Sequence, residues 1–319
     1  MPESERKLIE RIRRQARRGS RRKTGQALVT GIGDDAAVLR LPPNHELLVT
    51  TDFSIENIHF RRDWHSPEVV GWRCLTRGLS DIAAMGGAPM AAFLSLAVAS
   101  DVPQAWVSRF LKGLLGLARK FGVPLAGGDT AETVVGVQAD IVVVGAVPRG
   151  TAVLRSGAKP GDRIFVTGEL GGSAAALCRL RDSLPLGRER ARHFRPMARM
   201  GVGQWLREHK IPTAMIDISD GLSTDLGHIC KESGVGAEID ARAIPLFGRG
   251  KSRVWLDFAL HGGDDYELLF TSGKQVPREI DGIPITFIGE ITRQKGMRLV
   301  DEAGRKRTLA SKGWEHFRG

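Results

Sequence analysis

Residues 31–52 read GIGDDAAVLRLPPNHELLVTTD, and this stretch sets the expectations for the rest of the chain. Two short apolar runs, 35–41 and 47–51, flank the turn residues PPNHE. Apolar runs on either side of such a turn predict a pair of antiparallel strands. We therefore expect a β-hairpin in which the residues that precede the first strand lie beside those that end the second.

The predicted hairpin would gather acidic and hydroxyl side chains at one end. These side chains are Asp34, Asp35, Thr50, Thr51 and Asp52. Carboxylates that lie this close together repel one another unless a cation sits among them. Hard oxygen ligands of this kind suit Mg²⁺. The stretch therefore predicts the core of a magnesium–phosphate site, with the choice between Asp34 and Asp35 left open.

The length of 319 residues fits two domains of about 150 residues each. The segment 148–162, rich in Gly, Pro and turn residues, is the expected junction, which gives domains 1–150 and 151–319. A hydrophobic content of 42% with 26% charged residues is ordinary for a globular protein. No apolar run of about 18 residues predicts a membrane span. The Arg-rich N-terminus is unlike a secretory signal, and three scattered cysteines favour a reducing, cytoplasmic setting.

The net charge of +11 comes from two segments. Residues 1–24 carry ten Lys or Arg against three Glu, and residues 179–199 carry seven Arg against two acidic residues. The remainder is close to neutral. An Arg-rich, solvated surface is the favoured interpretation, because no aromatic residues interleave with these charges for base stacking. RNA or anionic-surface binding through the N-terminal helix remains the alternative.

Strand and helix patterns alternate in both halves and predict an α/β (α+β) fold. The expected strands beyond the hairpin are 91–99, a short one ending in 127–130, 139–147, 163–168, 213–219, 235–240, 266–271 and 284–291. The expected helices are 4–18, 66–85, 103–121, 171–180, one ending near 210, one starting near 221, and 251–261.

Seven aspartates flanked by Gly, Ser or Thr follow or end apolar segments. They are Asp35, Asp52, Asp81, Asp129, Asp217, Asp220 and Asp264. Any one of them is most simply a helix cap or a turn residue. Asp81 is different, because it falls inside an apolar helix and there needs a cation partner. The seven together predict a polynuclear metal site.

A site of this kind suits phosphoryl transfer from ATP to an anionic acceptor. Mg²⁺ ions held by carboxylates neutralise the charges that the transition state brings together. A phosphate acceptor is already ionised near neutral pH, so the reaction needs no general base. The sequence shows no Ser-His-Asp or Cys-His arrangement, and we predict no catalytic nucleophile or base among its side chains.

Several single residues have two interpretations. Arg155 in the junction suits contact with a nucleotide phosphate, or is a solvated turn residue. His59, seven residues after Asp52, suits contact with the acceptor, or is structural. Trp314 is either a core residue of the tail or a stacking surface. Cys178 and Cys230 lie in helical patterns and are expected to be core thiols.

At these residues the chain resembles a known family. GIGDDAAVL, TTDF with NIHF, LSDIAAMGGAP, LAGGDT, LRSGAKPGD, DISDGLSTDLGHI, HGGDDYELLF and GWEHF occur in the order found in thiamine-monophosphate kinases of the PurM-like superfamily. The resemblance runs from about Lys7 to Phe317. Aminoimidazole ribonucleotide synthetase, selenophosphate synthetase and the hydrogenase maturation dehydratase share the layout, so a sister ATP-dependent synthetase is the alternative function. NIHF, SDIAAMGG and GWEHF look like the thiamine branch.

The resemblance implies ATP-dependent phosphorylation of thiamine monophosphate to thiamine diphosphate, assisted by several Mg²⁺ ions. It implies a homodimer in which the N-terminal halves contribute strands to an intersubunit β-barrel, and in which the C-terminal half is an α/β domain. Neither a membrane nor a nucleic acid is an expected partner.

The resemblance also assigns residues. The Mg²⁺ ligands would be Asp35, Thr50, Thr51, Asp52, Asp81, Asp129, Asp217 and Asp220. The ATP contacts would be Gly128, Asp129, Arg155 and Ser219, and the thiamine phosphate contacts would be His59, Asp264 and Trp314. The family usually has Glu where this chain has Asp264, so the side chain at this position is one methylene shorter here, and a contact from it to the aminopyrimidine is expected to be longer or bridged by water.

Overall fold

The computed structural model describes residues 5–17, 27–249 and 253–316. The chain forms two compact units, one of Met1–Ile82 with Gly87–Gly150 and one of Ala83–Gly86 with Thr151–Gly319. The main change of unit thus falls between Gly150 and Thr151. Each unit combines a sheet with helices, as the predicted α/β class requires. Among the described residues, no helix has both the length and the apolar character needed to cross a membrane.

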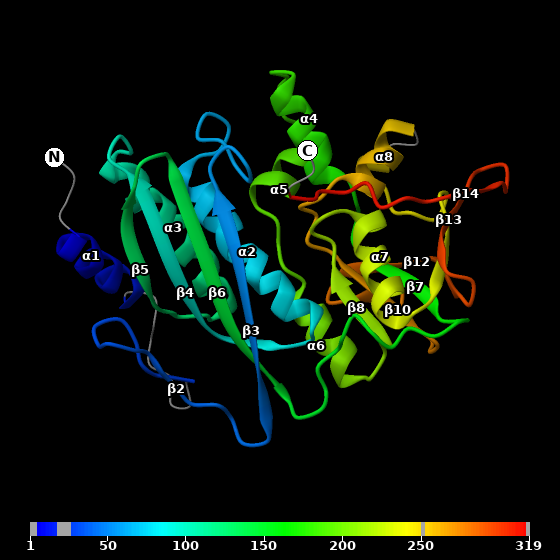
Figure 1. Ribbon diagram of the computed structural model, residues 1–319, viewed down its shortest axis with the longest axis horizontal. Coiled ribbons are helices and arrows are strands. Elements are labelled where there is room, and N and C mark those ends of the chain that lie inside the picture. Colours follow the sequence, from blue (N-terminus) through cyan, green and yellow to red (C-terminus); the bar gives the residue numbers. More distant parts are fainter. Residues whose placement is uncertain (1–4, 18–26, 250–252, 317–319) are drawn as a thin grey trace. The chain divides into compact units, whose positions relative to one another are not determined.

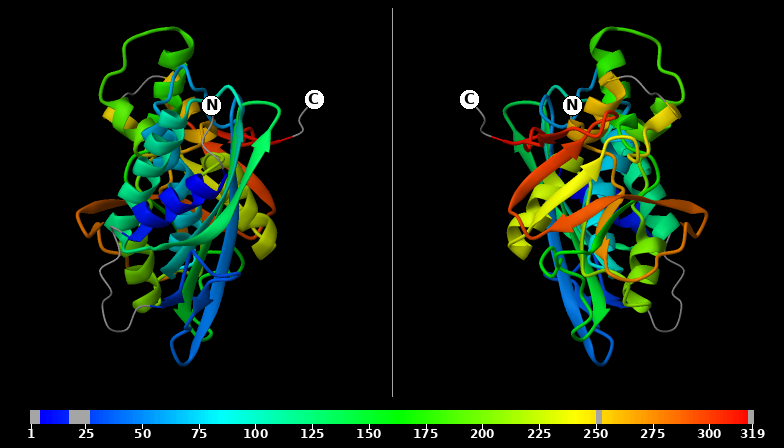
Figure 2. Two further views of the ribbon diagram at one scale, coloured as in Figure 1. Left: turned by 90° about the vertical axis from the view of Figure 1, so that its left-hand side faces the viewer. Right: turned by 90° about the vertical axis from the view of Figure 1, so that its right-hand side faces the viewer.

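The first unit is built on a four-stranded sheet in the order β3-β6-β4-β5. Its elements are β3 (His45–Ile55), α2 (Pro67–Ala84), β4 (Ala88–Ala99), α3 (Gln104–Phe121), β5 (Leu125–Thr133) and β6 (Val137–Pro148). β4 and β5 are parallel, and the other neighbours are antiparallel. Figures 1 and 2 show α2 and α3 lying against one face of this sheet.

The predicted hairpin is wrong. β2 (Val38–Leu39) pairs with β1 (Leu28–Thr30) in a separate two-stranded sheet, whereas β3 pairs with β6 along its whole length. The apolar segment 139–147 offers β3 a partner of matching length, which the short run at 35–41, ended by Pro42 and Pro43, does not. As a result, strand pairing does not bring Asp34 and Asp35 beside the end of β3.

The basic N-terminal helix α1 (Glu5–Arg17) is attached to the first unit. Ile12 is buried, and Arg11 donates a hydrogen bond through Nη1 to Oγ of Ser108 on α3. One arginine of this helix therefore has a structural partner. The basic residues at 18–24 lie outside the described residues.

The second unit is built on a sheet in the order β14-β13-β9-β12-β7-β10-β8, with β11 paired to β12. Its strands are β7 (Arg163–Thr167), β8 (Ala214–Asp217), β9 (Gly236–Asp240), β10 (Leu268–Ser272), β11 (Glu279–Ile280), β12 (Ile283–Thr292), β13 (Gly296–Val300) and β14 (Lys306–Thr308). Its helices are α4 (Gly172–Arg181), α5 (Glu189–Phe194), α6 (Met200–Glu208), α7 (Leu222–Ser233), α8 (Arg253–His261) and the 3₁₀ turn η1 (Phe247–Arg249). The strands β11, β13 and β14 had no counterpart among the predicted elements.

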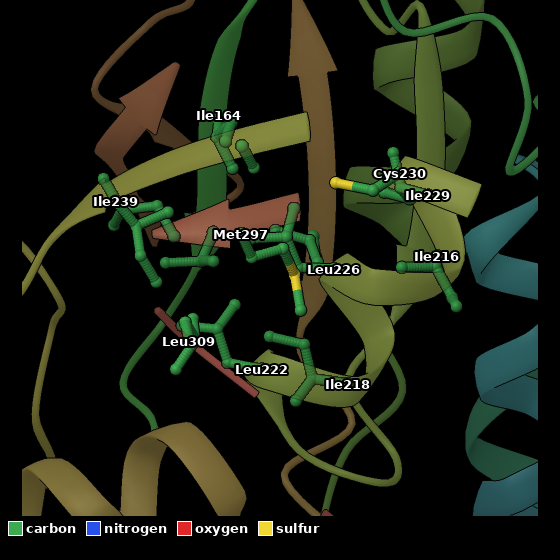
Figure 3. Packing of buried hydrophobic residues seen from close by; sticks show 14 of the residues in the cluster. Ile164, Ile216, Ile218, Leu222, Leu226, Ile229, Cys230, Ile239, Met297 and Leu309 are labelled. Carbon is green, nitrogen blue, oxygen red and sulfur yellow. The ribbon is translucent and has the colours of Figure 1, made fainter. Parts of the chain in front are cut away.

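The core of the second unit forms where α7 packs on this sheet. Leu222 and Leu226, one helical turn apart, are buried together with Ile216, Ile218 and Met297 (Figure 3). Leu222 follows Ile218 by only four residues, so the loop between β8 and α7 is fixed at both ends by buried apolar side chains. This loop carries Ser219 and Asp220.

The three cysteines are free, and they differ in burial. Burial raises the pKa of the Cys74 thiol to about 12 and that of the Cys230 thiol to about 11. Cys178 is only half buried, and its thiol donates to Oδ2 of Asp182 over 3.6 Å. The expectation of a core thiol is therefore confirmed for Cys230 and wrong for Cys178.

Helices α2 and α3 approach each other closely at two glycines. A Cβ atom on Gly71 would lie 2.0 Å from the carbonyl oxygen of Phe110, and one on Gly113 would lie 1.9 Å from that of Glu68. Both are backbone contacts, so a side chain at either position would have to push the helices apart. The spacing of the two helices thus depends on these glycines.

We predict that Gly113→Ala lowers the free energy of unfolding by about 1–3 kcal/mol, because the added methyl overpacks the helix contact. Urea denaturation measures this change. Gly116→Ala on the same helix is the matched control, since the nearest atom to its Cβ is 4.0 Å away. The control should stabilise the chain by up to about 1 kcal/mol. Equal effects of the two substitutions would contradict the close approach.

Candidate active site

The predicted ligands on β3 are divided between the two faces of its sheet. Successive side chains of a strand point to opposite faces. Thr50 and Asp52 share a face with the buried residues Leu48 and Ser54, whereas Thr51 is exposed on the other face. The single cluster expected at a hairpin end is thus replaced by two groups of side chains.

On the face of Thr50 and Asp52, two polar contacts link β3 to α2. Thr50 donates a hydrogen bond through Oγ1 to Oδ2 of Asp81, and Arg77 Nη1 lies 3.6 Å from Asp52 Oδ1. The half-buried Asp81 therefore has a hydroxyl partner inside the protein. Arg77 was missed by the sequence reasoning, although it precedes Asp81 by four residues and so lies on the same side of the helix.

On the opposite face, Thr51 donates a hydrogen bond through Oγ1 to Oδ1 of Asp140 at 2.6 Å. The strand register places Asp140 opposite Ser95, and Ser95 opposite Asp129. This face therefore carries a row of polar groups across all four strands of the sheet. Asp140 was also missed, and its signal was a single charge within the apolar run ADIVVVGAV.

Gly128 has a backbone conformation that requires glycine. Its φ is +139°, and a Cβ atom there would lie 1.8 Å from the carbonyl oxygen of Leu94. The next residue, Asp129, is exposed, and its Oδ1 accepts the N–H of Thr130 at 2.8 Å. The glycine thus lets β5 run close to β4 while the aspartate beside it stays at the surface.

Two other predicted residues lie in loops of the first unit. Asp35 is exposed, and its backbone N–H donates to Oδ1 of Asp34 at 3.1 Å. His59 accepts the N–H of Ile55 through Nδ1 at 3.0 Å, closing the turn that follows β3. This hydrogen bond supports the structural interpretation of His59, and its contact with the acceptor stays a prediction.

In the second unit, Asp217 ends β8 and is buried, and the loop after it is held by Asp225. Oδ2 of Asp225 accepts the backbone N–H groups of Asp220 at 3.2 Å and Gly221 at 3.0 Å. Burial, followed by the charges of Asp217 and Asp220, raises the pKa of Asp225 well above its ordinary value. Three acidic side chains therefore share a small, poorly solvated space.

Among the described residues, one group of three His, Cys, Asp or Glu side chains has its possible metal-ligand atoms within 4.8 Å of one another. The group consists of Asp220, Asp225 and His228. The group combines one predicted ligand with two residues that sequence reasoning missed. The signal was present in DISDGLSTDLGHI, where Asp225 and His228 are three residues apart and therefore share a helix face.

Asp264 lies beside the loop that carries Asp220. Its backbone N–H donates to the carbonyl of Ser219 at 2.8 Å, and its Oδ1 accepts the hydroxyl of Tyr266 at 2.6 Å. Asp264 and Tyr266 both have positive φ, +63° and +52°, a strained conformation for residues with side chains. The contacts on both sides of this segment hold it in place.

The remaining two predicted residues are both partly exposed. Trp314 is 50% exposed, and its backbone N–H donates to the carbonyl of Asp220 at 3.0 Å. Its interpretation as a core residue is therefore wrong. The side chain of Arg155 is exposed, and its backbone carbonyl accepts a hydrogen bond from Ser233 Oγ at 3.3 Å.

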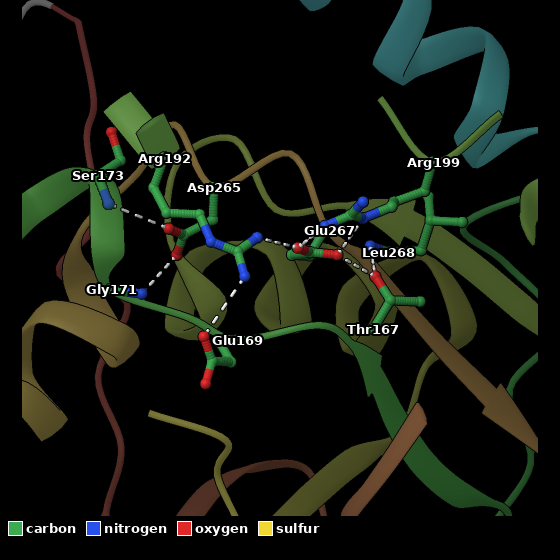
Figure 4. A network of polar contacts seen from close by, with 9 residues as sticks. All are labelled: Thr167, Glu169, Gly171, Ser173, Arg192, Arg199, Asp265, Glu267 and Leu268. Carbon is green, nitrogen blue, oxygen red and sulfur yellow. Dashed lines mark hydrogen bonds and ion pairs between the residues drawn. The ribbon is translucent and has the colours of Figure 1, made fainter. Parts of the chain in front are cut away.

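A buried ion-pair network lies next to the segment 264–266 (Figure 4). Glu267 is fully buried and accepts hydrogen bonds from Arg199, from Arg192 at 3.2 Å and from Thr167 at 2.6 Å. Burial alone would lower the pKa of Arg199, but the bonded, charged Glu267 raises it. Two arginines of the basic segment 179–199 therefore have structural partners, and the interpretation of that segment as a solvated surface is wrong for them.

Asp265 is the second buried acid of the network. It accepts the N–H groups of Gly171 at 2.8 Å and Ser173 at 3.5 Å, at the start of α4 (Figure 4). Burial, which outweighs these hydrogen bonds, raises the pKa of Asp265 to about 8. At neutral pH this carboxyl therefore holds its proton in the folded chain.

We predict that Asp265 makes stability fall as pH rises. An unfolded Asp releases its proton near pH 4, whereas the folded one keeps it to about pH 8. Between these two pH values the native state binds one proton more than the unfolded state does. The stability that this proton gives the native state decreases as pH rises and is lost once pH passes the folded pKa. Relative to Asp265→Asn, the wild-type chain should lose up to about 1.4 kcal/mol per pH unit between pH 5 and 8. Urea unfolding across this range measures it, and a constant difference would refute it.

The model for the N-terminal domain of AIR synthase related proteins matches residues 33–147, and that for the C-terminal domain matches residues 159–302. Together the two matches make the chain an AIR synthase related protein with the PurM-like two-domain α/β fold.

Similarity to individual proteins shows which family of this class the chain belongs to. Thiamine-monophosphate kinase of Escherichia coli K12 is 40% identical over 305 residues, covering 90% of this chain and 91% of the relative. The crystal structure of thiamine-monophosphate kinase from Stenotrophomonas maltophilia has 33% identity and a TM-score of 0.78, covering 92% of this chain and 95% of that one. AaThiL complexed with AMPPCP and TMP has 31% identity and a TM-score of 0.77, covering 98% and 97%. The chain belongs to the thiamine-monophosphate kinase family.

Proposed function

We propose that this chain phosphorylates thiamine monophosphate to thiamine diphosphate with ATP, by direct in-line transfer of the γ-phosphate. The observation that carries the proposal is full-length similarity to thiamine-monophosphate kinases, one of which is known in complex with AMPPCP and TMP. The reaction uses ATP, so we expect the enzyme in the cytoplasm. Both substrates are small molecules, and a phosphate acceptor removes the need for a protein nucleophile or base.

The donor atoms present fit Mg²⁺, which prefers carboxylate and hydroxyl oxygens. The proposed ligands are Asp35, Thr50, Thr51, Asp52, Asp81, Asp129, Asp217 and Asp220. Bound Mg²⁺ would supply positive charge against the phosphates. For Asp217 and Asp220, the support is local, since Asp217 precedes and Asp220 lies in the loop between β8 and α7 that Asp225 holds through backbone N–H groups. For Asp35, the support is the family resemblance alone, because the strand that follows it pairs with β1 and not with β3.

The proposed ATP contacts are Gly128, Asp129, Arg155 and Ser219, and the proposed thiamine phosphate contacts are His59, Asp264 and Trp314. Gly128 has no side chain to obstruct a ligand at an exposed position. The half-exposed ring of Trp314 suits stacking on the cationic thiazolium. Asp264 is held in a strained conformation, as functional residues often are.

We predict that Asp52→Asn, Asp129→Asn and Asp220→Asn each lower turnover of thiamine monophosphate with Mg-ATP at least about 100-fold, because each removes a carboxylate proposed to hold the Mg²⁺ that aligns the phosphates. ADP release measures turnover, and circular dichroism checks the fold. Asp101→Asn and Asp257→Asn, at exposed positions, are the matched controls and should retain wild-type rates. A near-native rate in any of the first three would remove that residue from the site. Turnover with aminoimidazole ribonucleotide precursors or selenide would favour a sister synthetase.

We also propose that a second copy of the chain covers the open face of the first sheet, with strands of both copies forming an intersubunit barrel. Leu47, Val49 and Phe53 on β3 are 48%, 63% and 57% exposed on the face that carries Thr51. A strand of large apolar side chains in water is costly and marks a contact surface.

We predict that Val49→Glu converts a dimer into a monomer of 34.7 kDa, because it places a charge in the covered face. Sedimentation velocity at several concentrations measures the mass. Val254→Glu on α8, where valine is 57% exposed, is the control and should remain dimeric. A wild-type chain that sediments as a monomer at all concentrations would refute the proposed dimer.

A further inference from the structure

The C-terminal tail is joined to the loop that carries Asp220 by consecutive hydrogen bonds. Gly313 N–H donates to Thr224 Oγ1 at 3.0 Å, and Trp314 N–H donates to the carbonyl of Asp220 at 3.0 Å. One residue earlier, Lys312 N–H donates to Ser223 Oγ at 3.4 Å. The tail is the segment after β14, drawn in red in Figure 1. Its backbone therefore follows the start of α7 residue by residue.

Close packing at Gly313 makes this contact specific. A Cβ atom on Gly313 would lie 2.1 Å from the carbonyl oxygen of Asp220 and 2.6 Å from Thr224 Oγ1. No residue other than glycine fits there without moving the tail. The glycine thus allows the tail to lie directly on the loop.

Ser223 joins a third segment to this contact. It is fully buried, and its Oγ lies 2.9 Å from Nδ1 of His261, at the end of α8. His261 precedes Asp264 by three residues. One buried hydroxyl thus connects the tail, the start of α7 and the segment that leads to Asp264. A buried hydroxyl with partners on two other segments fixes the distance between them.

We infer that Ser223 and Thr224 are positioning residues for thiamine monophosphate: they hold the tail so that the ring of Trp314 stays beside the loop of Asp220. The inference rests on the proposed function, since it deepens the role given to Trp314. The tail is held through its backbone, while the ring is half exposed. The ring is therefore available to a ligand, and its place is set by groups that need not touch that ligand.

The test combines kinetics with hydrogen exchange. Thr224→Val keeps the shape of the side chain and removes the acceptor, and Gly313→Ala displaces the tail. Both should raise the KM for thiamine monophosphate about tenfold with little change in kcat or in the KM for ATP, and both should speed amide exchange at 312–314. Thr224→Ser restores the hydroxyl and should behave as the wild type, and Thr308→Val, at an exposed tail-proximal position, is the control.

A double-mutant comparison isolates the link to Trp314. Thr224→Val should raise the KM in the wild-type background and add nothing in Trp314→Ala, because both changes remove the same contact. Additive effects, unchanged exchange at 312–314, or an unchanged KM in both single variants would overturn the inference. If the wild-type chain does not phosphorylate thiamine monophosphate at all, the proposed function fails, and the exchange data alone then decide whether the tail is held as inferred.

Discussion

The second unit depends on keeping the buried charge of Glu267 paired. Removing a carboxylate from water costs several kcal/mol unless partners surround it, and here Arg192, Arg199 and Thr167 do so. The backbone carbonyl of the same residue accepts the N–H of Ile218, which directly precedes the loop of Ser219 and Asp220. The ion pairs therefore fix the point from which both the loop after β8 and the strained segment 264–266 are built.

Buried acids organise this unit in a common way. Asp225 accepts backbone N–H groups of the loop after β8, and Asp265 accepts those at the start of α4. A carboxyl that takes up main-chain donors replaces the water they would otherwise bind. The loops thus obtain a defined shape without regular hydrogen-bonded pairing, while Ile218 and Leu222 anchor one of them in the apolar core.

Sequence periodicity predicted most strands and helices, because alternation and helical spacing are local properties. It could not predict strand partners, and the hairpin failed for that reason: β3 finds β6 about ninety residues away. Asp140 and Arg77 were missed for the same reason, since each could be recognised as a site residue only from its contact with a residue of β3. Glu267 looked like one residue of an ordinary strand, because the residues next to it in the sequence do not indicate that two arginines of a distant basic segment are its partners. Asp225 and His228 could have been predicted, because they lie three residues apart on one face of the helix that begins in the same motif as Asp220.

The burial of the cysteines affects how readily their thiols react with oxidants and electrophiles. A thiol reacts as its thiolate, and the pKa values near 12 and 11 keep Cys74 and Cys230 almost entirely protonated at cellular pH. Cys178 is only half buried, but burial and the neighbouring Asp182 raise the pKa of its thiol as well, so all three cysteines are held largely in the unreactive thiol form.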